Sequence, residues 1–186
     1  MAQEKHCLCC GEQVPVNTVT RDGNIELTCV YCGFVLDVAR PGSPRKALEC
    51  ILTADDSGAT RTIIQGMLVN KKLANTVISF ENGQAVVAAF TKRIVEHQPV
   101  DVVILDVQMP VMDGITAARL IRSVETDHQK AKTPILFFSA QKCDEDLKRQ
   151  IERFAPASYV NKGSDPDPEQ LIERIDQLVA HLQTQS

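Results

Sequence analysis

The sequence of 186 residues contains no tryptophan, and aromatic residues make up only 4% of it. Its core must therefore be formed mainly by Val, Ile, Leu and Ala. It also contains no apolar run of the roughly 18 to 20 residues that a membrane-spanning helix requires. Its first ten residues include no apolar segment typical of a secretory signal. We therefore expect no membrane contact and no export, which predicts a cytoplasmic location.

An excess of positive charge is also absent, because 20 Lys and Arg stand against 24 Asp and Glu, for a formal net charge of −4. This balance argues against a protein whose main role is to coat nucleic acid, since such proteins carry a basic surface. The other proportions, 44% hydrophobic and 24% charged residues, are those of a globular protein. The length corresponds to a little more than one average domain.

Cysteine is the residue type that is unexpectedly abundant, with seven in all and five within the first 32 residues. Two pairs, Cys7 with Cys10 and Cys29 with Cys32, each enclose two residues and are each followed by a glycine. Eighteen residues separate the pairs, a spacing typical of a four-cysteine zinc site. Zinc takes four thiolates in a tetrahedron, and a tight turn aims both sulfurs of one pair at the same point. We therefore predict a zinc site at these four cysteines.

Alternatives to this site are free thiols or a disulfide, which a reducing compartment disfavours. Cys9 is left over and is an alternative ligand. His6, next to Cys7, could compete as a ligand, but its side chain is expected to lie in solvent. A turn signal at residues 21–24 between strand-like segments makes residues 1–39 resemble a zinc ribbon, a small β module held by metal. So short a segment has little core, so its folding should depend on zinc. Residues 40–46, rich in Pro and Gly, are predicted to be a linker.

Residues 47–186 alternate between strand and helix patterns. Short apolar runs predict five strands at residues 48–53, 76–80, 101–106, 134–139 and 157–161. Apolar residues at helical spacing follow each run, and the last helix begins at Asp167-Pro168, a capping residue followed by proline. Five such units predict an α/β fold with a parallel sheet covered by helices on both sides. Ligands bind such sheets at the carboxyl ends of the strands.

Polar residues occupy these strand ends. Asp55 and Asp56 follow the first strand, Asp106 ends the third, Ser139 ends the fourth and Lys162 follows the fifth. Three carboxylates at one edge repel each other unless a cation lies among them, and Mg²⁺ is commonly held by carboxylates together with phosphate oxygens. A lysine and a hydroxyl at the same edge suit the oxygens of a phosphoryl group. One aspartate can then act as a nucleophile and form an aspartyl phosphate.

These residues resemble the receiver domain of bacterial two-component response regulators, a flavodoxin-like (βα)5 fold of the CheY type. The resemblance covers about residues 47–183. It rests on the strand-end groups named above and on the segment 109–114, Ser139-Ala140 and Tyr159. It implies that Asp106 is the phosphoacceptor, and that Mg²⁺ is held by Asp55, Asp56, Asp106 and the backbone carbonyl of Gln108. It further implies that Ser139 and Lys162 contact the phosphoryl group, and that Ser139 and Tyr159 form the switch.

The mechanism implied by the resemblance is transfer of a phosphoryl group from a histidine kinase or histidine phosphotransfer protein to Asp106. The added charge would draw Ser139 inwards and change a protein-interaction surface near the fourth helix and fifth strand. The protein would not be a dedicated enzyme, although it would catalyse its own phosphorylation and slow dephosphorylation. One departure is Gly163, which stands where the family usually has a proline. Asp113 is expected to cap a helix instead of joining the site.

Three functions follow from these patterns. The first is a signalling switch that acts on a downstream protein, with the zinc ribbon as a docking element. The second is a transcription regulator whose zinc ribbon contacts DNA. The five Lys and Arg against six Asp and Glu in residues 1–49 weigh against it, although Arg40, Arg45 and Lys46 form a small basic patch. The third, a phosphatase or hydrolase that uses the same acids, lacks any recognisable general base.

Overall fold

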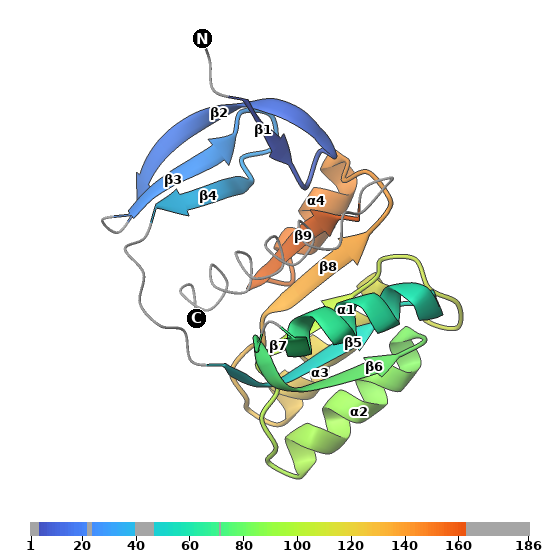
Figure 1. Ribbon diagram of the computed structural model, residues 1–186. Coiled ribbons are helices and arrows are strands. Elements are labelled where there is room, and N and C mark those ends of the chain that lie inside the picture. Colours follow the sequence, from blue (N-terminus) through green and yellow to red (C-terminus); the bar gives the residue numbers. More distant parts are fainter. Residues whose placement is uncertain (1–3, 22–23, 40–46, 71, 163–186) are drawn as a thin grey trace.

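The structure, a computed structural model, describes residues 4–21, 24–39, 47–70 and 72–162. These residues form two sheets, a four-stranded one at the N-terminal end and a five-stranded one that carries the helices (Figure 1). The predicted linker at residues 40–46 and the predicted helix that begins at Asp167 lie outside the described residues. No helix in the described part of the chain is long and apolar enough to cross a membrane.

The N-terminal sheet is antiparallel, with its strands in chain order: β1 (Glu4–Cys7), β2 (Glu12–Arg21), β3 (Asn24–Cys29) and β4 (Val35–Ala39). We call residues 4–39 the cysteine module. The register pairs Arg21 with Asn24, so β2 and β3 are antiparallel neighbours on either side of the predicted turn, whose residues 22 and 23 lie outside the described residues. β1 was not predicted, because it is only four residues long and mostly polar.

Two tight turns, residues 7–11 and 29–33, bring the cysteines together, and we call them the first and second knuckle. The amide of Gly11 donates a hydrogen bond to the carbonyl of Cys7 at 2.7 Å, and Gly33 does the same to Cys29 at 2.9 Å. Both glycines have positive φ, 75° and 70°, a conformation that costs glycine little. This explains why a glycine follows each cysteine pair.

The second sheet is parallel throughout, with the order β6-β5-β7-β8-β9. Its strands are β5 (Leu48–Ala54), β6 (Ala74–Phe80), β7 (Val102–Leu105), β8 (Ile135–Ser139) and β9 (Ala157–Asn161). The described helices are α1 (Gly58–Asn70), α2 (Gly83–Val95), α3 (Gly114–Asp127) and α4 (Glu145–Glu152). The predicted fold class and all five predicted strands are confirmed, with small shifts at the strand ends.

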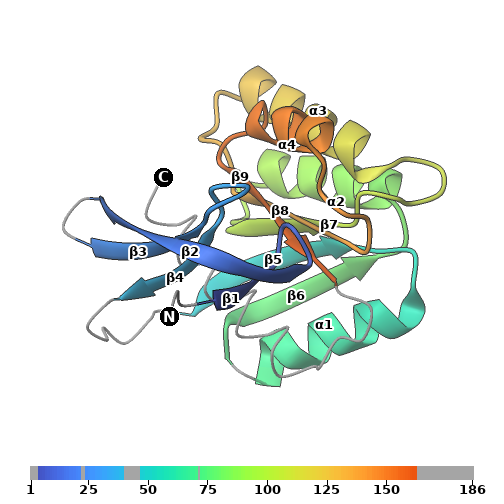
Figure 2. The same ribbon diagram turned by 90° about the horizontal axis from the view of Figure 1, so that it is seen from above.

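Helices cover both faces of this sheet, with α1 on one face and α2, α3 and α4 on the other (Figure 2). The central strand β7 is buried along its whole length, which explains its unbroken run of aliphatic residues. The buried side chains fall into two clusters, one on the side of α1 and one on the side of α2, α3 and α4. Both views place the cysteine module beside the β8–β9 side of the sheet (Figures 1 and 2).

Candidate functional site

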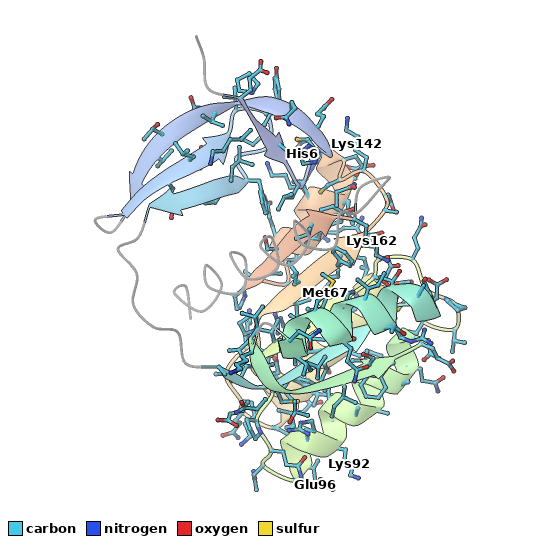
Figure 3. All side chains as sticks on the ribbon, viewed as in Figure 1. His6, Met67, Lys92, Glu96, Lys142 and Lys162 are labelled. Atoms are coloured by element: carbon cyan, nitrogen blue, oxygen red, sulfur yellow. The ribbon has the colours of Figure 1, made fainter. Side chains whose placement is uncertain are left out.

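Three strand ends bring acidic and basic side chains together at one edge of the parallel sheet. Asp55 follows β5, Asp106 follows β7 and Lys162 follows β9. The ammonium of Lys162 lies 2.6 Å from a carboxylate oxygen of Asp55 and 2.5 Å from one of Asp106. Figure 3 labels Lys162. Ligand oxygens of Asp55, Asp56 and Asp106 all lie within 4.8 Å of one another. We call these four residues the acid pocket.

Burial decides the electrostatics of the acid pocket. Asp55 is 2% exposed and Asp106 is 6% exposed, whereas Asp56 is open to solvent. Burial raises the pKa of Asp55 above its usual value, and the hydrogen bond from Lys162 acts against this rise. Among the described residues, Lys162 forms ion pairs with two of these three carboxylates, Asp55 and Asp106. The remaining negative charge of the group favours the binding of a cation. Carboxylate oxygens in such a group are ligands that Mg²⁺ prefers.

Backbone hydrogen bonds hold the acids in place. The amide of Ser57 donates to Asp55 at 2.9 Å, and the amide of Gln108 donates to Asp106 at 3.2 Å. Asp113 accepts a hydrogen bond from the amide of Thr116 and is the N-cap of α3. The prediction that Asp113 caps a helix is therefore confirmed, and its carboxylate is used outside the acid pocket.

Gly114 lets the start of α3 approach the phosphoacceptor candidate closely. A Cβ atom at Gly114 would lie 2.0 Å from the backbone carbonyl oxygen of Asp106, a distance that no side chain tolerates. A side chain at this position would therefore push apart the strand end that carries Asp106 and the first turn of α3.

The variant Gly114→Ala is expected to lower the free energy of unfolding by about 3 kcal/mol, because the backbone must move to relieve the overlap. The matched control is Gly66→Ala in α1, where an added Cβ meets nothing within 4 Å and should stabilise the helix by about 0.5–1 kcal/mol. Urea unfolding measures both. Equal effects of the two substitutions would contradict the close approach at Gly114.

The two predicted switch residues lie on neighbouring strands and are both buried. The hydroxyl of Ser139, at the end of β8, accepts a hydrogen bond from the amide of Gln141 at 3.4 Å. The phenol of Tyr159 donates a short hydrogen bond to the carbonyl of Gln141. Tyr159 is 3% exposed, and its burial raises the pKa of the phenol. The ring is therefore packed inwards against the connection between β8 and α4.

The four paired cysteines form a second cluster of possible metal ligands. The sulfurs of Cys7 and Cys32 lie 3.5 Å apart and those of Cys10 and Cys29 3.9 Å apart, and all four lie within 4.8 Å of one another. A tetrahedral site with zinc–sulfur bonds of about 2.3 Å needs sulfurs about 3.8 Å apart. The observed spacing therefore fits zinc without rearrangement of the backbone.

The pKa values of these thiols are shifted in opposite directions. The hydrogen bond between Cys7 and Cys32 lowers the pKa of Cys32, and the same contact raises the pKa of Cys7. Burial raises the pKa of Cys10. Four thiolates this close repel one another, so a dication is what would let all four lose their protons together.

Sequence reasoning missed a group of residues that join the cysteine module to the acid pocket. Asn161 directly precedes Lys162, and its amide donates to the carbonyl of Leu8 at 2.7 Å. The side chain of Asn161 donates to the carbonyl of Gln141 at 2.9 Å. Lys142, labelled in Figure 3, forms an ion pair of 3.2 Å with Glu12. These residues belong to no motif in the sequence, and the contacts between them join distant parts of the chain, so no local pattern marks them.

The profile of the family described as response regulator receiver domain matches residues 51–176. The chain belongs to this family. It therefore acts in two-component phosphorelay signalling, the process in which receiver domains take part. The match begins within β5 and so leaves out the cysteine module.

Two curated relatives match much of the chain. The gliding motility regulatory protein of Myxococcus xanthus is 33% identical over 163 residues, 84% of this chain, and the sensor protein GacS of Pseudomonas syringae is 30% identical over 126 residues, 68% of it. These matches cover only 19% and 13% of the two relatives. Among solved structures, the receiver domain of the histidine kinase CKI1 from Arabidopsis thaliana, complexed with Mg²⁺ and BeF3⁻, has a TM-score of 0.60. It is 24% identical, and the match covers 71% of this chain and 90% of that one.

Proposed function

We propose that Asp106 accepts a phosphoryl group from the phosphohistidine of a histidine kinase or a histidine phosphotransfer protein. The observation that carries this proposal is the acid pocket, in which a nearly buried carboxylate at the end of the central strand contacts the ammonium of Lys162 at 2.5 Å. An oxygen of Asp106 would attack phosphorus in line as the nitrogen–phosphorus bond breaks, so the electron pair leaves with the histidine nitrogen.

Residues of the acid pocket also fit a magnesium ion. The ligands would be Asp55, Asp56, Asp106 and the backbone carbonyl of Gln108, since three of them already lie within 4.8 Å of one another. When bound, Mg²⁺ would offset the negative charge that develops on the phosphoryl oxygens. The related receiver domain of CKI1, which was crystallised with Mg²⁺ and BeF3⁻, supports this choice of metal.

Lys162 and Ser139 would complete the binding of the phosphoryl group. Lys162 would turn from the carboxylate of Asp106 towards a phosphoryl oxygen, and the Ser139 hydroxyl would donate to another. Ser139 would then give up its hydrogen bond with the amide of Gln141, the residue whose carbonyl accepts a hydrogen bond from Tyr159. Movement of Ser139 and Tyr159 would thus transmit phosphorylation to the surface of β8, β9 and α4. Later attack by water would return the free carboxylate and release inorganic phosphate.

We propose that the cysteine module binds zinc through Cys7, Cys10, Cys29 and Cys32. The sulfur spacing supports this choice, as do the two knuckles whose glycines hold the required turns. We also propose that the output of the protein is contact with a downstream protein. Contact of the module with DNA is the second candidate, favoured only by the basic patch at Arg40, Arg45 and Lys46, which lies outside the described residues.

Incubation of the full chain with acetyl phosphate is expected to add one phosphoryl group per chain when Mg²⁺ is present and almost none when EDTA removes it. The reason is that the acid pocket cannot offset the charge of the incoming group without a cation. Intact-mass spectrometry measures the uptake, and lability to hydroxylamine identifies an acyl phosphate. Equal uptake with EDTA, or a product stable to hydroxylamine, would refute the proposal.

A further inference from the structure

Two cysteines outside the predicted zinc site lie side by side at the boundary between the cysteine module and the receiver sheet. Cys9 belongs to the first knuckle, and Cys143 lies in the connection between β8 and α4. Their side chains form a hydrogen bond with each other. Both are free thiols, and neither is among the four sulfurs that could hold one metal ion. The structure therefore contains a pair of thiols that the proposed function does not use.

Hydrogen bonds of neighbouring residues hold the two chain segments that carry this pair. The carbonyl of Leu8, directly before Cys9, accepts a hydrogen bond from the amide of Asn161 at 2.7 Å. The side chain of Asn161 donates to the carbonyl of Gln141, two residues before Cys143, at 2.9 Å. Both segments are thus fixed to the same residue at the end of β9, so the two sulfurs are brought together by the fold.

Two further contacts join the same segments. Glu12 of β2 and Lys142 form an ion pair of 3.2 Å between mostly exposed side chains. Cys9 and Tyr159 are buried in the apolar cluster on the side of α4, and Cys143 packs against the same cluster. The segments that carry the two thiols are therefore joined both at the surface and in the core.

The two thiols differ in their access to solvent. Cys143 is partly exposed, whereas Cys9 is only 5% exposed. The hydrogen bond with Cys9 lowers the pKa of Cys143, and the thiolate is the form of cysteine that attacks an oxidant. An accessible thiol of lowered pKa beside a second, shielded thiol is the arrangement in which oxidation ends in a disulfide.

From this arrangement we propose that Cys143 and Cys9 form a redox modification site, at which a hydroperoxide converts the two thiols into a disulfide between the receiver and the cysteine module. The sulfur of Cys143 would attack the peroxide and lose its proton, so the S–O bond forms, the O–O bond breaks and, with hydrogen peroxide, water leaves. The sulfur of Cys9 would then attack the sulfenic acid of Cys143, so the S–S bond forms, the S–O bond breaks, and the hydroxide leaves as water with the proton of Cys9. The two thiols together lose two electrons, and the peroxide is reduced.

This disulfide would leave the four predicted zinc ligands and the acid pocket unchanged, because it uses only Cys9 and Cys143. A covalent bond between these residues would keep the first knuckle beside β9 whether or not the module holds its metal. Transient, redox-sensing disulfides are the kind found in reducing compartments. The inference does not depend on phosphorylation of Asp106.

Equimolar hydrogen peroxide, added to the full chain purified with zinc, is expected to lower its mass by about 2 Da, the two hydrogen atoms that the thiols lose. Dithiothreitol should reverse the change. Trypsin releases Cys9 in residues 6–21 and Cys143 in residues 143–148, and fragmentation of the linked peptides identifies the two sulfurs. The inference would be overturned by the absence of any link, by a link between Cys9 and Cys32, the other thiol that Cys9 contacts, or by links only among the four predicted zinc ligands.

Single variants test the two roles separately. Cys143→Ser should lose the link, and Cys9→Ser should lose it as well but accumulate a sulfenic acid on Cys143, which dimedone traps. Cys50→Ala is the matched control, because Cys50 is fully buried within β5 and its variant should form the link as the wild type does. Dimedone on a cysteine other than Cys143 in Cys9→Ser, or loss of the link in Cys50→Ala as well, would contradict the assignment.

Discussion

Replacing Asp106 with asparagine is expected to reduce phosphoryl uptake from acetyl phosphate to background, because the amide has no carboxylate oxygen to attack phosphorus. Asparagine has nearly the same shape as aspartate, so the fold should be kept. The loss of one buried negative charge also leaves Lys162 with Asp55 as its only described carboxylate partner. Intact-mass spectrometry of the wild type and the variant, in the same Mg²⁺ buffer, measures the effect.

The matched control for this prediction is Asp113→Asn. Asp113 lies only seven residues after Asp106, but its carboxylate caps α3. Asparagine is an equally good capping residue, so this variant should take up phosphate as the wild type does. Full uptake by Asp106→Asn would show that another residue is the nucleophile. Loss of uptake in both variants would point to a general effect on the fold.

Removal of zinc, or the substitution Cys29→Ser, is expected to unfold the cysteine module while leaving the parallel sheet folded. The module is small, and structural zinc supplies about 10–16 kcal/mol of apparent binding free energy in comparable sites. The buried cysteines Cys7 and Cys29 are themselves part of its core, so thiolates left there without the metal would repel one another. Hydrogen exchange should rise in residues 4–39 and remain slow in β7.

Elemental analysis provides the direct measurement, with about one zinc per wild-type chain and less than a tenth of that in Cys29→Ser. Cys143→Ser is the control, because Cys143 lies outside the cluster of four possible ligands and its variant should retain zinc. A wild-type chain purified without zinc, or a Cys29→Ser variant that keeps it, would contradict the proposed site.

The parallel sheet was predictable because its evidence is local. Unbroken aliphatic runs such as residues 102–105 indicate a strand buried on both faces, and the polar residues that follow these runs necessarily meet at one edge. This reasoning placed Asp55, Asp106 and Lys162 together, and the structure brings them within hydrogen-bonding distance. The proximity of the paired cysteines was equally predictable, because the spacing of two CxxC turns, each followed by a glycine, is typical of four cysteines that meet at one point.

The docking of the module could not be predicted in this way. Leu8, Glu12 and Asn161 carry no motif, and their contacts join residues more than a hundred positions apart. Glu12 and Lys142 are mostly exposed residues, which composition alone assigns to solvent. Cys9 was interpreted as a spare thiol because the zinc site needs only four ligands. Cys9 is buried against the receiver by tertiary packing, which the spacing of the cysteines in the sequence does not predict.

The hydrogen bond between Leu8 and Asn161 has a consequence for how copies of this protein meet. β9 is an edge strand among the described strands, and an edge strand with open amide and carbonyl groups is a template on which a second chain can add a strand. Here the first knuckle covers the end of that edge with its own backbone. Loss of zinc would then expose the backbone groups at this end of β9 as well as unfold the module. Copies of the chain could pair along the exposed edge, so the solubility of the protein would depend on zinc.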